Sequence, residues 1–118
     1  MIKKILVVDD NNIFCNAVKN HLLQKEYEVE ICTSCAEFKN KINIKRFDLI
    51  LLDLRLKDGQ GLDILKDISE ITPGKKVVMI SSYLDNENIS KAKKFGAYKC
   101  INKNSNLFYE LDHIIGTL

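Results

Sequence analysis

Short apolar runs that each lead into a polar residue are the feature of this sequence that most restricts its fold. Residues 5–8, 49–52 and 77–80 are apolar throughout, and a shorter run lies at 100–101. Continuous apolar runs of this length are typical of strands that are buried on both faces of a parallel sheet. The polar residues that follow these runs are Asp9 and Asp10, Asp53, Ser81 and Lys103.

Amphipathic segments with helical spacing alternate with the apolar runs. The strand expected at 28–32 alternates acids with apolar residues, which indicates a place near the edge of the sheet. The second helix is expected to carry Phe38, Ile42 and Ile44 on its apolar face. The predicted helices begin after a cap at Asn11 or Asn12, at the capping box 34–37, near Leu62, after a cap at Asp85, and after a cap at Ser105.

This alternation predicts an α/β fold of the (βα)5 type, with a doubly wound parallel sheet. Right-handed crossovers limit the strand order, and the flavodoxin-like order 2-1-3-4-5 places the first and third strands side by side. The carboxyl ends of parallel strands lie along one rim, where ligands bind. We therefore expect Asp9, Asp10 and Asp53 to meet at this rim, together with Ser81 and Lys103.

The chemistry of this set favours phosphoryl transfer. Three carboxylates close together repel one another, and a hard divalent cation resolves that repulsion. Mg²⁺ prefers oxygen ligands and leaves part of its shell to water and phosphate oxygens. Lys103 supplies a positive charge and Ser81 a hydrogen-bond donor, which suit a phosphoryl group. Asp53 is the candidate nucleophile, because a carboxylate can form an aspartyl phosphate and the two adjacent acids can share the metal.

Helix capping is the simpler interpretation of acids at strand ends. For Asp9 or Asp10 alone it stays as good an interpretation as a metal site. The whole set, in this order along the chain, favours the site.

Length and composition are consistent with one cytoplasmic domain. The chain has 118 residues and a net charge of +2, which is too small to argue for nucleic-acid binding. No apolar run approaches the length of a membrane span, and the apolar stretch near the N-terminus is too short for a signal peptide. We expect a single domain over 1–118 with no membrane contact.

Cys32 and Cys35 form a C-x-x-C pattern at a predicted strand-to-helix junction. A redox pair can sit at such a junction. A zinc site needs about four ligands, and no second Cys or His pair has a suitable spacing. We expect both cysteines to be reduced and structural.

Taken together, several motifs of this chain resemble those of response-regulator receiver domains of two-component signalling, over essentially the whole length. The motifs are LVVDD at 6–10, LLDLRLKDG at 51–59, MISS at 79–82, Gly96-Ala97, and Lys103. The resemblance implies that Asp53 is the phosphoacceptor and that Ser81 and Lys103 contact the phosphoryl oxygens. It implies that Asp10, Asp53 and the Arg55 backbone carbonyl bind Mg²⁺, and that Asp9 acts on the metal mainly through water.

The resemblance also implies partners. The phosphodonor would be a sensor histidine kinase or a phosphotransfer protein. The surface of the fourth helix, fifth strand and fifth helix would control an output domain or partner, such as a transcriptional one, and is a candidate homodimer face. DNA contact is expected only through an output domain outside this chain. Such a domain catalyses phosphorylation and dephosphorylation of its own aspartate, and whether this makes it an enzyme stays open. The alternative is an atypical receiver that acts as a phosphorylation-independent interaction module.

Three positions depart from the family's usual pattern. Lys57 and Asn104 stand where the family often has proline, and Cys100 stands where it usually has an aromatic residue. A trans bond between Lys103 and Asn104 would be expected to affect how the lysine is placed. Tyr98 would face the same side of a regular strand as Cys100 and is the candidate replacement for the aromatic residue.

Other proteins of similar fold fit the motifs less well. A flavin-binding flavodoxin needs a Ser/Thr-rich phosphate loop where this chain has acids at 9–10, and a dinucleotide-binding fold needs a G-x-G-x-x-G motif, which is absent. An aspartyl phosphatase would need a general acid two residues after Asp53, and Arg55 is not one.

Overall fold

A five-stranded sheet forms the centre of the computed structural model, which describes residues 3–41, 43–104 and 106–118. All neighbouring strands of this sheet pair in parallel, in the order β2-β1-β3-β6-β7. The predicted order 2-1-3-4-5 is therefore confirmed, with β2 at one edge. The strands are β1 (Lys4–Val8), β2 (Glu28–Cys32), β3 (Leu49–Asp53), β6 (Val77–Ser81) and β7 (Lys99–Asn102).

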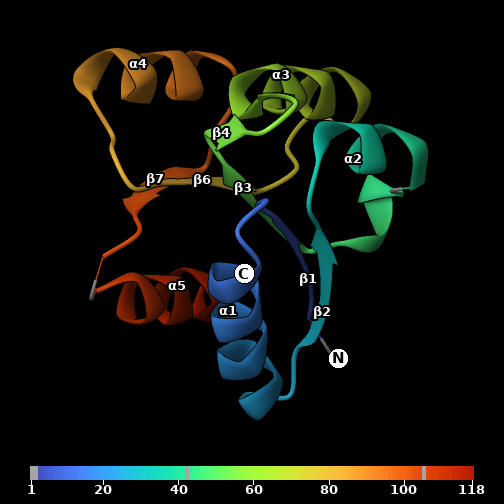
Figure 1. Cartoon of the computed structure of the whole chain (residues 1–118), viewed down its shortest axis with the longest axis vertical. Coiled ribbons are helices and arrows are strands. Elements are labelled where there is room, and N and C mark those ends of the chain that lie inside the picture. The colour runs from blue at the N-terminus through green and yellow to red at the C-terminus, as the bar shows by residue number, and fades with distance from the viewer. Residues whose placement is uncertain (1–2, 42, 105) are drawn as a thin grey trace.

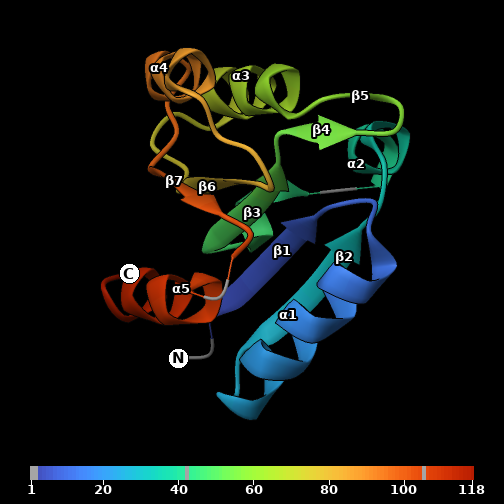
Figure 2. The ribbon, with the colours of Figure 1, turned by 60° about the vertical axis from the view of Figure 1, so that its left-hand side comes forward.

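Helices cover both faces of the sheet. Figures 1 and 2 show α2, α3 and α4 on one face, and α1 and α5 on the other. Within the described part of the chain, no helix has the length and apolar character needed to cross a bilayer. The helices are α1 (Asn12–Gln24), α2 (Cys35–Lys41), the 3₁₀ turn η1 (Ile44–Arg46), α3 (Gly61–Ile71), α4 (Asn86–Lys94) and α5 (Leu107–Gly116).

Alternation along the strands divides the core into two layers. Leu6 and Val8 of β1 pack on the side of α2, α3 and α4, whereas Ile5 and Val7 pack on the side of α1 and α5. Successive side chains of a strand point to opposite faces, so a strand covered on both faces must be apolar throughout. This explains why the apolar runs of β1, β3 and β6 are continuous.

Helix starts follow the predicted caps closely. Asn11 Oδ1 accepts the Phe14 N–H at 3.1 Å, and Asp85 Oδ1 accepts the Asn88 N–H at 2.7 Å. Ser34 Oγ accepts the Glu37 N–H at 3.0 Å, as one half of the predicted capping box requires.

The end of α2 differs from the prediction. Ile44 does not belong to this helix, because α2 ends at Lys41 and Ile44 begins the turn η1. Asn43 Oδ1 accepts the Lys45 N–H at 3.2 Å and so caps a separate turn. The predicted roles of Ile42 and Ser105 lie outside the described residues.

A small antiparallel hairpin follows Asp53, where no strand was predicted. It consists of β4 (Arg55–Leu56) and β5 (Gly59–Gln60), joined by Lys57 and Asp58. Gly61 lies so close to the Asp53 carbonyl that a Cβ at this position would overlap it. The glycine therefore holds the start of α3 against the end of β3, which fixes both ends of the hairpin.

Candidate functional site

The five polar residues predicted to meet do lie at the carboxyl rim of the sheet. Asp53 and Ser81 are the last residues of β3 and β6, Asp9 and Asp10 follow β1, and Lys103 follows β7. Carboxylate oxygens of Asp9, Asp10 and Asp53 lie within 4.8 Å of one another. The adjacency of β1 and β3 in the sheet produces this cluster, because it aligns the ends of the two strands.

Lys103 connects two of the acids. Its Nζ lies 2.6 Å from Asp9 Oδ2 and donates to Asp53 Oδ2 at 3.2 Å. It also lies 4.5 Å from the centroid of the Phe14 ring, so an aromatic face covers the ammonium. The Lys103–Asn104 peptide is trans. The trans bond therefore does not keep the ammonium from the acids.

The cluster shifts the pKa values of Asp53 and Lys103. Burial, reinforced by the negative charge of Asp9, raises the pKa of Asp53, although Lys103 opposes the shift. Burial alone would lower the pKa of Lys103, but hydrogen bonds and charge from Asp9 and Asp53 outweigh it and raise that pKa. Three carboxylates thus face one ammonium among the described residues, which leaves the cluster with excess negative charge.

The donor set fits a divalent cation. Asp9 is fully buried, and its Oδ1 accepts the Asn11 N–H at 2.9 Å. Its Oδ2 is also buried and faces the Lys103 ammonium at 2.6 Å. Three carboxylates that share one ammonium leave excess negative charge, which a hard cation with oxygen ligands would offset. The triad of Asp9, Asp10 and Asp53 could therefore hold a metal ion.

Ser81 is engaged by the loop that follows it. Its hydroxyl donates to the Tyr83 carbonyl at 2.9 Å and accepts the Tyr83 N–H at 3.1 Å. An open pocket of about 400 Å³ lies beside these groups. Its lining residues are Asp53, Arg55, Ser81, Ser82, Tyr83 and Lys103. The pocket thus brings the candidate nucleophile, the hydroxyl and the ammonium together, and Arg55 lies at the same opening.

Sequence reasoning missed three groups that support the site. The ring of Phe14, on α1, covers the Lys103 ammonium. The Lys57 N–H donates to Asp10 Oδ2 at 2.6 Å, and the Asp58 carboxylate accepts two N–H groups of α2. Only Asp58 had a signal that could have revealed it, because aspartate is a preferred capping residue.

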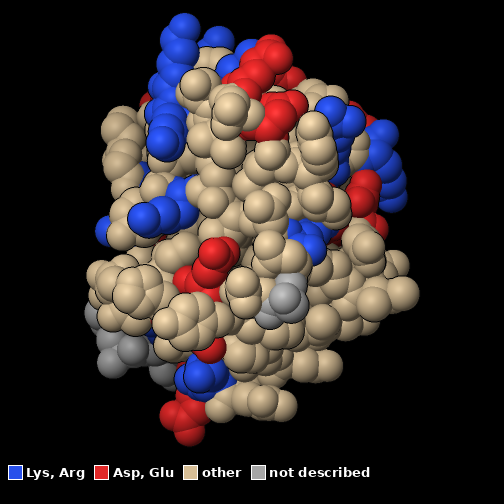
Figure 3. Space-filling model, turned by 90° about the vertical axis from the view of Figure 1, so that its left-hand side faces the viewer, with Lys and Arg blue, Asp and Glu red and all other residues tan. Residues whose placement is uncertain are grey.

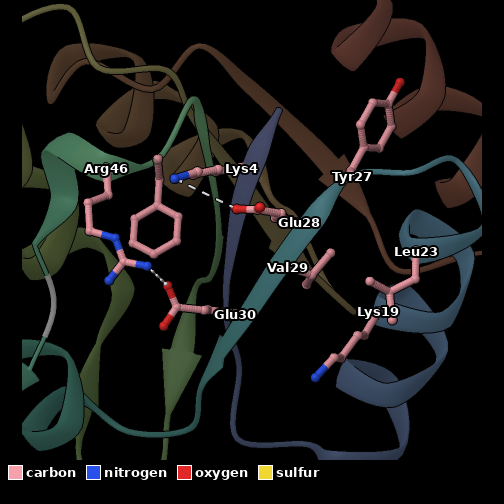
Figure 4. Close-up of a pocket in the computed structure, with 9 residues that line it drawn as sticks. Lys4, Lys19, Leu23, Tyr27, Glu28, Val29, Glu30 and Arg46 are labelled. Atoms are coloured by element: carbon pink, nitrogen blue, oxygen red, sulfur yellow. Dashed lines mark hydrogen bonds and ion pairs between the residues drawn. The ribbon is translucent and has the colours of Figure 1, made fainter. Parts of the chain in front are cut away.

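A second pocket, of about 410 Å³, lies along the outer edge of β2, away from the acid cluster. Figure 4 shows that ion pairs occupy one side of it: Arg46 with Glu30, and Lys4 with Glu28. The pairing leaves this pocket without a cluster of unmatched charge, so we place the functional site at the carboxylates.

The cysteines remain thiols, as expected for structural residues. Cys32 and Cys35 are both buried, and all four cysteines of the chain are free. Burial raises the pKa of the Cys32 thiol to about 11. A reactive cysteine needs a lowered pKa and some exposure, so this environment argues against redox chemistry.

Comparison with known proteins agrees with this geometry. The family model for the response regulator receiver domain matches residues 5–113, and the chain belongs to this family. The transcriptional regulatory protein ZraR of Klebsiella oxytoca is 31% identical over 93 residues, which are 79% of this chain and 21% of ZraR.

Solved structures show the same fold. A CheY-like receiver domain protein of Methanospirillum hungatei is 30% identical with a TM-score of 0.84, covering 99% of this chain and 94% of that protein. The non-phosphorylated receiver domain of HemR from Leptospira biflexa is 27% identical with a TM-score of 0.89, covering 97% of this chain and 92% of that domain. Curated relatives are often longer: the chain spans 21% of ZraR and 40% of the regulatory protein VanRB of Enterococcus faecalis.

Proposed function

We propose that residues 1–118 form one receiver domain that accepts a phosphoryl group on Asp53, in the presence of Mg²⁺, from a sensor histidine kinase or a phosphotransfer protein. The observation that carries this proposal is the position of the Asp53 carboxylate. It lies among Asp9, Asp10 and Lys103 and opens into a pocket that also contains Ser81. Each group needed for transfer is present within reach of one nucleophile.

The chemistry is an in-line displacement at phosphorus. An Asp53 oxygen bonds to phosphorus while the bond to the donor nitrogen of phosphohistidine breaks, and the released imidazole nitrogen takes up a proton. Lys103 and Ser81 contact the phosphoryl oxygens and stabilise their charge. Asp10, Asp53 and the Arg55 carbonyl would hold Mg²⁺, with Asp9 acting through water, and the bound ion would neutralise charge on the same oxygens.

Output follows from the link between Ser81 and the loop before α4. If the Ser81 hydroxyl turns to the phosphoryl group, it gives up its hydrogen bond to the Tyr83 carbonyl. The loop would then be free to shift, and α4 with it. A ligand moves such an equilibrium only through its different affinity for the two states, which here is the new Ser81 contact.

The surface formed by α4, β7 and α5 is our candidate for reading that shift. Figure 3 faces this side and shows charged groups of both signs dispersed over a mainly uncharged surface. Tyr83, Tyr98 and Tyr109 are exposed large side chains near or on these elements. Tyrosine is enriched at protein interfaces, so a homodimer or an output domain that controls transcription fits this surface.

The direct test is phosphorylation by a small acyl phosphate. Wild-type protein treated with acetyl phosphate and Mg²⁺ should gain the mass of one labile phosphoryl group in intact-mass measurement. EDTA should prevent the gain. A chain that stays unlabelled with Mg²⁺ present, and that is also unlabelled by histidine kinases, would instead be a phosphorylation-independent interaction module.

As pH falls, Mg²⁺ binding should begin to weaken at a higher pH than it would if Asp53 had the pKa of an ordinary aspartate. The pKa of Asp53 is raised from its ordinary value of 3.8, so the metal-free protein binds a proton there as pH falls through the raised value. The metal must displace that proton, which weakens its binding. Calorimetric titration with Mg²⁺ at decreasing pH should show a rising dissociation constant and proton release. A constant affinity down to the ordinary aspartate range would contradict this expectation.

A further inference from the structure

The β4–β5 hairpin lies between the acid cluster and the start of α2. Figure 2 shows both strands of the hairpin beside α2, directly after β3. Its two turn residues are Lys57 and Asp58, and each contacts a different neighbour. One neighbour is α2, and the other is Asp10.

Asp58 fastens the hairpin to α2. Its Oδ1 accepts the Cys35 N–H at 2.8 Å, and its Oδ2 accepts the Ala36 N–H at 3.0 Å. These backbone hydrogen bonds lower the pKa of Asp58 and so favour its charged form. Gly59 is equally close to the helix, because a Cβ there would lie 2.8 Å from Cys35 Sγ. The turn is thus anchored by a charged acceptor and by a close backbone approach.

Lys57 reaches the acid cluster through its backbone and not through its side chain. Its N–H donates to Asp10 Oδ2 at 2.6 Å, while the side chain is exposed. Each carboxylate oxygen has a second lone pair, so this bond leaves Asp10 able to bind a cation. A proline at position 57 would have no N–H and could not make the contact.

We propose that the Lys57 N–H and the Asp58 carboxylate are positioning groups for the metal site. Asp58 fixes the turn on α2, and the fixed turn holds the Asp10 carboxylate in the orientation in which it binds Mg²⁺. This inference rests on the proposed function, because it requires that the acids bind Mg²⁺. Hydrogen bonds to ligating groups set their orientation, and losing one typically weakens metal binding by about 10–100-fold.

Two matched pairs of variants test the proposal by the Mg²⁺ dissociation constant, measured by calorimetry. Lys57→Pro removes the N–H, whereas Lys57→Ala removes the same exposed side chain and keeps the N–H. Asp58→Ala removes the anchor, whereas Asp67→Ala removes an exposed carboxylate elsewhere, on α3. We expect Lys57→Pro and Asp58→Ala to bind Mg²⁺ about tenfold more weakly than the wild type. The two controls should bind it as the wild type does.

Thermal unfolding in EDTA separates positioning from simple helix capping. If Asp58→Ala lowers the thermal midpoint but leaves the Mg²⁺ affinity unchanged, Asp58 only caps α2 and the proposal is wrong. Asp58→Asn keeps one acceptor oxygen, so it should lose less affinity than Asp58→Ala, and it serves as the test if Asp58→Ala does not fold. If the wild-type protein binds no Mg²⁺, the proposed function is contradicted as well. If the wild type binds Mg²⁺ and each variant has the same dissociation constant as its control, only the positioning proposal is overturned.

Discussion

Replacing Asp53 with Asn should abolish phosphoryl transfer to this chain while leaving the fold intact. An amide is not a nucleophile towards phosphorus under these conditions, so the reaction loses the group that forms the new bond. Asn has nearly the same shape, and position 53 is only 8% exposed, so the cavity stays filled. Intact-mass measurement after treatment with acetyl phosphate and Mg²⁺ should show no added phosphoryl group.

The same substitution should not lower the stability of the metal-free protein. The raised pKa of Asp53, which burial and the charge of Asp9 cause, means that its negative charge is unfavourable in the folded state. That cost is fully present above the raised pKa and disappears as pH falls towards the ordinary value. Asn removes it at neutral pH, so the thermal midpoint in EDTA should stay equal or rise. Asp67→Asn is the control and should be phosphorylated normally; labelling of Asp53→Asn to the wild-type level would place the phosphoacceptor elsewhere.

Most of the sheet could be predicted because burial on both faces leaves a direct mark on the sequence. The runs in β1, β3 and β6 are apolar at every position because helices cover both sides, and few local structures besides a buried strand require so short a continuous run. The edge position of β2 was predicted for the opposite reason: Glu28 and Glu30 reach solvent, where they pair with Lys4 and Arg46.

The β4–β5 hairpin could not be predicted in the same way. Each of its strands has two residues, which is too short to show a period of two. Gly61 is required because the Asp53 carbonyl lies against it, and Gly59 because the Cys35 side chain lies against it. Close approach depends on which segment lies opposite, and that information is in the tertiary structure.

The candidate site also contains groups that could be predicted from the sequence and one that could not. Asp9, Asp53, Ser81 and Lys103 could be predicted because their chemistry lies in the side chains and their place follows from strand ends. The Lys57 N–H could not, because every residue except proline has such a donor and its partner Asp10 is 47 residues away. Supporting contacts made by the backbone can therefore be recognised only in the structure, whereas the reactive side chains can be recognised in the sequence.

Replacing Lys103 with Met should destabilise the metal-free protein by about 3 kcal/mol, the lower end of what breaking a buried ion pair costs. The Lys103 side chain is 14% exposed and Asp9 is fully buried, so water cannot replace the ammonium effectively. Protonation of Asp53, whose pKa is already raised, limits the cost and keeps it near this lower end. Urea unfolding in EDTA measures the change, and the exposed Lys94→Met is the matched control.

Mg²⁺ should offset part of the stability that this variant loses. Without Lys103, the three carboxylates have lost their nearest positive charge, so a divalent cation gains more from binding there than in the wild type. A ligand that binds only the folded state raises stability by RT ln(1 + [L]/Kd), and a lower Kd gives a larger rise. Millimolar Mg²⁺ should therefore stabilise Lys103→Met more than wild type, although the variant transfers phosphoryl groups poorly because Lys103 no longer contacts them. If Lys103→Met is as stable as Lys94→Met in EDTA and gains no more from Mg²⁺ than wild type, the ammonium does not offset the charge of the acids, and its role is confined to the phosphoryl group.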